Sequence, residues 1–167
     1  MSRAFVKEAD GDDVLEALPE RPVSPHLNLV TPQGLLWLRE QVRDLQALRN
    51  ALADSEDLAD RQRLHSLDRE LRYFDSRAST AVLVDPASQL DHHVHFGSTV
   101  EVVDQGGEVS SFAIVGEDEA DVAAGKISWV SPLARALLDA EVDDQVLWRR
   151  PAGDKTLTVL SIRKGTS

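Results

Sequence analysis

Apolar residues recur at alternating intervals of three and four positions in two stretches of the chain, residues 32–53 and 64–81. This interval places each series on one face of an amphipathic helix. Residues 53–57 form so short a connection that the two helices must reverse and pack along their apolar faces. We therefore predict an antiparallel α-helical hairpin, a short coiled coil, over residues 31–84. The two series are Leu35, Leu38, Val42, Leu45 and Leu52, interrupted at Arg49, and Leu64, Leu67, Leu71, Phe74, Ala78 and Ala81.

After residue 85 the pattern changes to that of strands. Segments rich in β-branched residues cover residues 94–103, 109–115, 126–130, 145–149 and 155–163, and Gln105-Gly106-Gly107 is typical of a hairpin turn. Ser131-Pro132 opens a short helix that ends at Leu138, because serine caps helices and proline suits the first helical turn. Residues 85–167 therefore predict an α+β domain, a twisted antiparallel sheet of about five strands with one short helix.

The segment that precedes the hairpin differs from both parts. Residues 1–30 hold several acidic side chains and the prolines Pro19, Pro22 and Pro25. Proline removes a backbone donor and disfavours helix at the residue before it. We predict an extended or disordered N-terminal extension over residues 1–30.

Charge and composition narrow the classes of function. The formal net charge of −11 opposes binding to naked nucleic acid over a broad surface and favours a partner with a basic surface. The chain has no cysteine, so a disulfide framework and a cysteine-bearing zinc site are both excluded. Neither a signal-peptide core nor an apolar run of membrane-spanning length is present in the sequence. We expect a cytoplasmic protein without a membrane partner.

The predicted tip of the hairpin is acidic. Asp54, Glu56, Asp57 and Asp60 lie at or just after the turn, and Arg61 and Arg63 follow them. Capping of the second helix explains carboxylates at this position, since a helix N-terminus favours negative charge. Weak attraction of a cation is the alternative. For the two arginines, a solvated helix face is the simplest interpretation.

Other candidate chemistry is sparse. Asp91, His92, His93 and His95 form the one dense group of metal-binding residue types, and a weak transition-metal site there competes with a solvated linker between domains. No further ligand has a suitable spacing, so we predict no metal. A prolyl-isomerase pocket needs a nest of aromatic side chains, and aromatic residues make up only 5% of the chain.

Two stretches of the chain, residues 63–73 with Val82–Asp85 and residues 127–138 with the turn at 141–144, resemble the GreA/GreB transcript-cleavage factors. Residues 63–73, running on to Val82–Asp85, are similar to the second coiled-coil arm and its exit into the next domain. Residues 127–138, followed by an acidic turn at 141–144, are similar to the signature of the C-terminal domain. The most specific part is the string Ser131-Pro132-Leu133-Ala134-Arg135-Ala136-Leu137-Leu138. The resemblance extends over residues 31–163.

The resemblance implies an FKBP-like C-terminal domain that docks on RNA polymerase at the rim of its secondary channel, with the coiled coil inside the channel. It implies a polymerase-binding set of Trp129, Val130, Ser131, Pro132, Leu133 and Arg135. Arg61 and Arg63 match basic positions that face the RNA end in cleaving members. Nucleic acid would be contacted only within the polymerase complex, and the protein is expected to be a monomer.

The chain departs from the cleaving members at the tip. Their acidic motif ends in Asn-Ala-Asp/Glu-Tyr and helps to hold a second metal ion, which activates water. That string is missing here, and the hairpin is shorter by several helical turns. Val130 also stands where cleaving members often have a polar residue. We predict a non-catalytic regulator without a cofactor. The alternatives are a cleavage stimulator with a shifted acidic tip, and an anti-Gre factor similar to the regulators of nucleoside diphosphate kinase.

Overall fold

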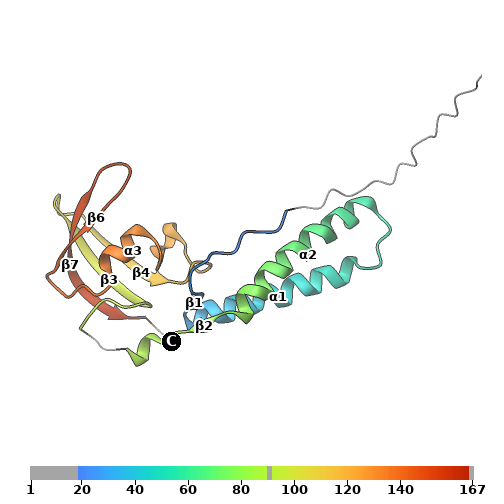
Figure 1. The fold of residues 1–167 in the computed structure, drawn as a ribbon, viewed down its shortest axis with the longest axis horizontal. Coiled ribbons are helices and arrows are strands. Elements are labelled where there is room, and N and C mark those ends of the chain that lie inside the picture. Colours follow the sequence, from blue (N-terminus) through green and yellow to red (C-terminus); the bar gives the residue numbers. More distant parts are fainter. Residues whose placement is uncertain (1–18, 90–91, 166–167) are drawn as a thin grey trace, which may run out of the picture.

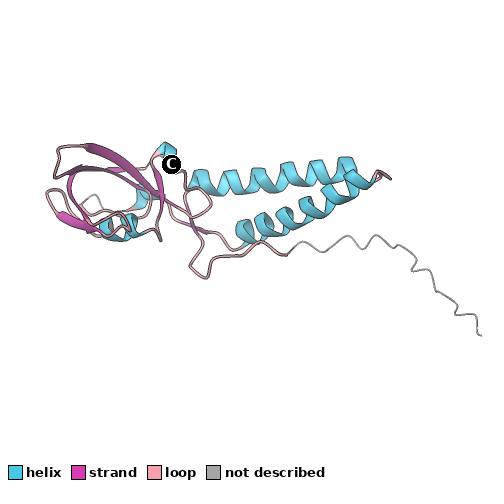
Figure 2. Ribbon diagram, turned by 90° about the horizontal axis from the view of Figure 1, so that it is seen from above, coloured by secondary structure: helices cyan, strands magenta, loops and turns pink. Residues whose placement is uncertain are grey.

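The computed structural model describes residues 19–89 and 92–165. A helical hairpin projects from one side of a sheet domain, so the molecule is elongated (Figure 1). The view from above shows the same division, with the two long helices extending away from the sheet (Figure 2). None of the helices in this described part combines the length and apolarity that a membrane crossing requires. Of the N-terminal extension predicted from the sequence, residues 1–18 lie outside the described residues.

The hairpin is confirmed, with helix bounds close to those predicted. Helix α1 spans Pro32–Leu52 and begins after Thr31, whose side chain accepts a hydrogen bond from the Gly34 amide. Helix α2 spans Leu58–Ser79 and begins after Asp57. At about 1.5 Å per residue, the 21 residues of α1 extend about 32 Å.

The apolar contact between the helices is concentrated at the base of the hairpin. Val30, Leu38 and Phe74 are buried there, and Leu35, Val42, Leu45, Tyr73, Ala78 and Ala81 pack against them. Towards the tip, Leu48 and Leu58 are about half exposed. The base therefore anchors the hairpin, and Leu67 is the buried seam residue of α2 nearest the tip.

A short parallel ribbon joins the start of the hairpin to its end. Strand β1 (Leu29–Val30) pairs with β2 (Val82–Leu83). The Val82 amide donates to the carbonyl of Asn28, and the Val84 amide donates to that of Val30. Neither two-residue strand follows from the hydrophobic pattern, which has no period over so short a length.

The C-terminal half confirms the predicted α+β class. Five strands form one sheet in the order β5-β4-β3-β7-β6. The α3 helix, Pro132–Leu137, covers one face, and its Leu133, Ala134 and Leu137 are buried against the strands. The strands are β3 (Ser98–Asp104), β4 (Val109–Val115), β5 (Lys126–Ser128), β6 (Gln145–Trp148) and β7 (Lys155–Lys164).

The sheet is mixed, which corrects the expectation of purely antiparallel pairing. Strand β5 runs parallel to β4, with Ala113 opposite Lys126 and Val115 opposite Ser128. The reason is the path of residues 116–125, which bring the chain back to the level of Ala113 before β5 begins. Gly125 makes the last turn at φ +72°, a left-handed conformation that glycine adopts without steric cost. The other pairings are antiparallel.

Candidate functional site

The segment between β5 and α3, together with the first turn of α3, forms an ordered surface region (residues 129–135), which we call the docking loop after the partner-binding role that the sequence analysis predicts for it. The Trp129 amide donates to the carbonyl of Val115, and the Ser131 hydroxyl accepts from the Ala134 amide at 3.2 Å as the cap of α3. Pro132 and Arg135 are exposed, and Trp129, Val130 and Ser131 are half-buried. The loop is thus held by backbone contacts while part of its side-chain surface faces outward.

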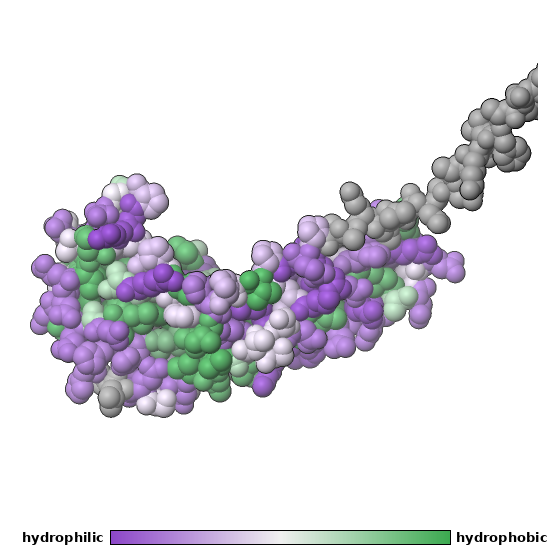
Figure 3. All heavy atoms as spheres, in the orientation of Figure 1, coloured by the Kyte–Doolittle hydropathy of each residue, from purple (hydrophilic) through white to green (hydrophobic). Residues whose placement is uncertain are grey.

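Leu133 differs from its neighbours in the predicted polymerase-binding set. Its side chain is 4% exposed and belongs to the core beneath the sheet. It can fix the position of α3, but it offers no surface to a partner. In the view of Figure 3, hydrophobic surface gathers over the C-terminal domain and the hairpin is mainly hydrophilic.

The tip of the hairpin lies at the far end of the helices from the docking loop (Figure 1). The Asp57 carboxylate accepts from the Ala59 amide at 2.8 Å and so caps α2. The Ser55 hydroxyl donates to Asp60 at 2.5 Å. Asp54 and Glu56 are exposed and have no hydrogen-bond or ion-pair partner within the described residues. The capping interpretation therefore accounts for one carboxylate directly.

Arg61 and Arg63 follow the tip on α2. Both are exposed, and neither forms an ion pair within the part of the chain that the structure describes. Their charge is therefore available to a partner, as is expected of solvated helix residues.

The histidines lie in the loop before β3 and not on a strand. His93 Nδ1 is 3.4 Å from Glu141 Oε1, and the rings of His93 and His95 are 6.2 Å apart. His92 is exposed, and Asp91 lies outside the described residues. Across residues 19–89 and 92–165, no group of three or more metal-ligating side chains is arranged to hold an ion.

Sequence reasoning missed the joint between the two parts of the molecule. The Arg77 guanidinium is 2% exposed, and its Nε donates to Asp118 at 2.5 Å. The Tyr73 hydroxyl donates to the other oxygen of the same carboxylate, also at 2.5 Å. The Thr31 hydroxyl donates to Glu119 at 2.6 Å. The acidic loop after β4 therefore binds both helices of the hairpin at their base.

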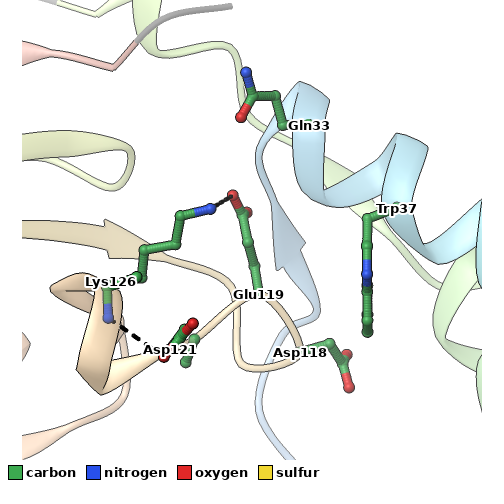
Figure 4. Close-up of a pocket in the computed structure, with 8 residues that line it drawn as sticks. Gln33, Trp37, Asp118, Glu119, Asp121 and Lys126 are labelled. Carbon is green, nitrogen blue, oxygen red and sulfur yellow. Dashed lines mark hydrogen bonds and ion pairs between the residues drawn. The ribbon is translucent and has the colours of Figure 1, made fainter.

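A cleft of about 450 Å³ opens beside this joint. Trp37 faces Glu119 and Asp118 across it, and Lys126 reaches over to Glu119 (Figure 4). Each carboxylate of the cleft already has a structural partner. Asp118 is held by Tyr73 and Arg77, and Asp121 accepts from the amides of residues 123 and 124. No two carboxylates that line the cleft are therefore free to act as a general acid and a general base. The side chains of the cleft stabilise the joint.

Tyr73, the single tyrosine of the chain, reports on this joint. Burial, together with the hydrogen bond to Asp118 and the charge of that carboxylate, raises its pKa to about 12. The unfolded chain releases the same proton near pH 10. The raised folded pKa therefore contributes stability that is fully present below about pH 10 and is lost as the pH rises towards 12.

We expect the ultraviolet absorbance of tyrosinate to titrate about two pH units higher in the folded protein than in urea. The Tyr73→Phe variant should show no such titration and a weaker loss of stability above pH 10. Equal midpoints in folded and unfolded protein would show that Tyr73 is not held by the joint.

Comparisons with known proteins identify the family of the chain. Residues 89–164 match the family model described as transcription elongation factor, GreA/GreB, C-term. The chain is 37% identical over 157 residues to the transcription elongation factor GreB of Xanthomonas axonopodis pv. citri, covering 84% of this chain and 94% of that protein. It is 32% identical to the transcription elongation factor GreA of Pseudomonas aeruginosa, covering 80% and 96%. The solved structure of GreA factor homolog 1 of Thermus thermophilus is 26% identical, covers 83% of this chain and 99% of that one, and has a TM-score of 0.38.

Proposed function

Because the chain belongs to the GreA/GreB family of transcription elongation factors, we propose that it regulates RNA polymerase without stimulating transcript cleavage. In this proposal the C-terminal domain docks at the rim of the secondary channel of the polymerase, and the short hairpin enters the channel. The protein acts as a monomer in the cytoplasm, and it contacts nucleic acid only inside the polymerase complex.

The docking loop supports the first half of the proposal. Its backbone is fixed by the Trp129–Val115 and Ser131–Ala134 hydrogen bonds, so little conformational entropy is lost when a partner binds. Pro132 and Arg135 extend outward from this fixed loop. Arginine at a protein interface is a frequent source of affinity, because its planar donors pair with carboxylates and backbone oxygens.

Replacing both exposed residues, Pro132→Ala with Arg135→Ala, should weaken binding to core RNA polymerase about tenfold or more, since the pair forms the outer part of the loop. A titration of fluorescently labelled protein with polymerase measures this change. The matched control is Val109→Ala with Arg149→Ala, which removes one apolar and one cationic side chain that are also exposed. Equal affinities of both double variants would contradict the proposed docking surface.

The proposed absence of cleavage rests on the structure of the hairpin tip. This is the observation that carries the proposal of a non-cleaving regulator. Metal-assisted hydrolysis needs carboxylates that are rigidly held at the metal ions, which stand about 4 Å apart. Here Asp57 is engaged in capping, and Asp60 accepts from Ser55. Leu48 and Leu58 near the tip are about half exposed, so the remaining carboxylates lack the support of a buried core. A hairpin of this kind adds bulk and negative charge to a channel through which nucleotides enter.

One observation favours the alternative of a shifted acidic tip. Asp54 and Glu56 are exposed without partners within the described residues, so they are accessible to a metal ion. A cleavage stimulator would have to bring both carboxylates to the metal ion of the polymerase from a hairpin only about 32 Å long. Incubation of the protein with stalled polymerase complexes that hold backtracked RNA separates the two functions.

A further inference from the structure

Residues 19–30 run beside the hairpin before α1 begins, and we call them the N-terminal strap (Figures 1 and 2). The first part of the strap contacts α2. Glu20 pairs with Arg72 at 2.6 Å, and Arg21 pairs with Glu70 at 2.8 Å. The Arg21 guanidinium also lies over the ring of Tyr73, 3.7 Å from its centre. A guanidinium stacked on an aromatic face is attracted by the ring and is fixed in direction.

The last part of the strap is built into the base of the hairpin. Asn28 is 5% exposed, and its side-chain amide donates to the carbonyl of Arg77 at 2.6 Å and to the Thr80 hydroxyl at 3.2 Å. The carbonyl of Arg77 is one of the last four in α2, which have no partner within the helix. The strap therefore completes the hydrogen bonding at the end of α2.

The middle and the end of the strap also touch the C-terminal domain. The ring of His26 stands edge-on to Trp129 of the docking loop, with centroids 6.2 Å apart. Gly116, at the end of β4, lies so close to the strap that a Cβ there would overlap the Leu29 carbonyl oxygen. The same short segment thus contacts both α2 and the C-terminal domain.

The spacing of these contacts allows the strap to limit changes in the direction of the hairpin relative to the C-terminal domain. Glu70, the partner of Arg21, lies three residues beyond Tyr73, the outermost joint residue on α2, and so about 4.5 Å further from the base of the hairpin. Residues 21–26 can span about 17 Å in extended form, which bridges the angle between α2 and the docking loop. Contacts that connect α2 to the docking loop at a distance from the joint resist bending of the hairpin more effectively than contacts at the joint itself. A change of about 10° in that angle would move the tip by about 5–6 Å over a hairpin of about 32 Å.

We propose that the N-terminal strap is a brace that fixes the direction of the hairpin relative to the docking loop, with Arg21 and His26 as its positioning residues. This inference rests on the proposed function only where it concerns the effect on polymerase. When the docking loop is bound, the brace determines where the tip stands in the channel. Loss of the brace leaves the docking surface intact and misplaces the tip.

The direction of the hairpin can be measured in the protein alone by the distance between two spin labels. The chain has no cysteine, so Gln46→Cys on α1 and Gln105→Cys in the β3–β4 turn, both at exposed positions, give unique attachment sites. We expect one narrow distance distribution, which widens at least twofold when Arg21→Ala and His26→Ala are added. Arg21→Lys alone should keep most of the narrow distribution, because the ion pair and the contact with Tyr73 are retained.

The matched control is the pair Val23→Ala and Leu27→Ala, which removes two strap side chains that are 50% and 67% exposed. Its distribution should equal that of the labelled reference protein. Because Arg21 and His26 are themselves exposed, thermal melting should confirm that both double variants fold. An unchanged distribution in the Arg21→Ala, His26→Ala protein would overturn the brace.

A second measurement uses core RNA polymerase and the Arg21→Ala variant, whose own spin-label distance distribution is recorded alongside. Its affinity should match the unmodified protein within about twofold, while its effect on the rate of RNA synthesis falls by half or more. If the unmodified protein has no affinity for polymerase, the proposed function fails, and the spin-label result still decides the brace. An undiminished effect on synthesis together with a widened distribution would overturn the claim that the brace places the tip.

Discussion

Replacing Arg77 by methionine should lower the free energy of unfolding by about 3–5 kcal/mol, because it leaves the Asp118 carboxylate without its cationic partner in a largely buried position. Arg77 is 2% exposed, and the side chain of Asp118 is 9% exposed. Methionine keeps most of the apolar contact of the arginine stem, so the loss reflects the uncompensated charge. Urea unfolding followed by circular dichroism measures the change.

The control for this substitution is Arg49→Met in the same hairpin. Arg49 pairs with Asp68 at 2.5 Å, but both side chains are about one-third exposed or more, so its loss should cost less than about 1 kcal/mol. Adding Asp118→Asn to Arg77→Met should recover part of the stability, because the buried charge is then gone. A cost for Arg77→Met no larger than that for Arg49→Met would show that the joint is not held by this ion pair.

Substituting alanine for Gly116 should cost about 1–3 kcal/mol, the range for inserting a methyl group where the packing has no space. Its Cβ would overlap the Leu29 carbonyl oxygen, a backbone atom of the β1 strand that pairs with β2. Either the strap or the loop after β4 must move to relieve the contact. Thermal or urea unfolding gives the cost.

Gly106→Ala in the exposed β3–β4 turn serves as the comparison. The nearest atom to its Cβ is the end of the Asp104 side chain at 3.3 Å, and no backbone atom beyond its chain neighbours lies within 4 Å, so the cost should stay below about 1 kcal/mol. If Gly116→Ala were equally well tolerated, the close approach of the strap to the sheet domain would not exist in solution.

Local patterns were sufficient to predict the hairpin and most of the strands. Thr31-Pro32 and Ser131-Pro132 mark helix starts through short-range capping, and the structure has both helices beginning at those prolines. The apolar series identified Leu38, Leu67 and Phe74 as seam residues, and all three are buried. These features depend on neighbours within a few positions, which a single sequence displays directly.

Features that depend on distant pairing were not predicted. The parallel pairing of β5 depends on the return path of residues 116–125, and the β1–β2 ribbon joins segments about fifty residues apart. The sequence analysis assigned no role to Arg77, because its partner Asp118 lies 41 residues away in the chain. The predicted polymerase-binding set also included a residue that is buried. Leu133 follows Pro132 directly, but the first turn of α3 directs it into the core.

The most direct test of the central claim uses stalled RNA polymerase complexes with backtracked RNA, incubated with the protein at several magnesium concentrations. The protein concentration should be high enough to saturate the polymerase, and a cleaving member of the family serves as the positive control. We predict no short 3′ RNA fragments beyond the level of polymerase alone, together with slower RNA synthesis when nucleotides are added. Fragments that appear with the protein and disappear with Asp54→Ala or Glu56→Ala would contradict the account and establish a shifted cleavage tip.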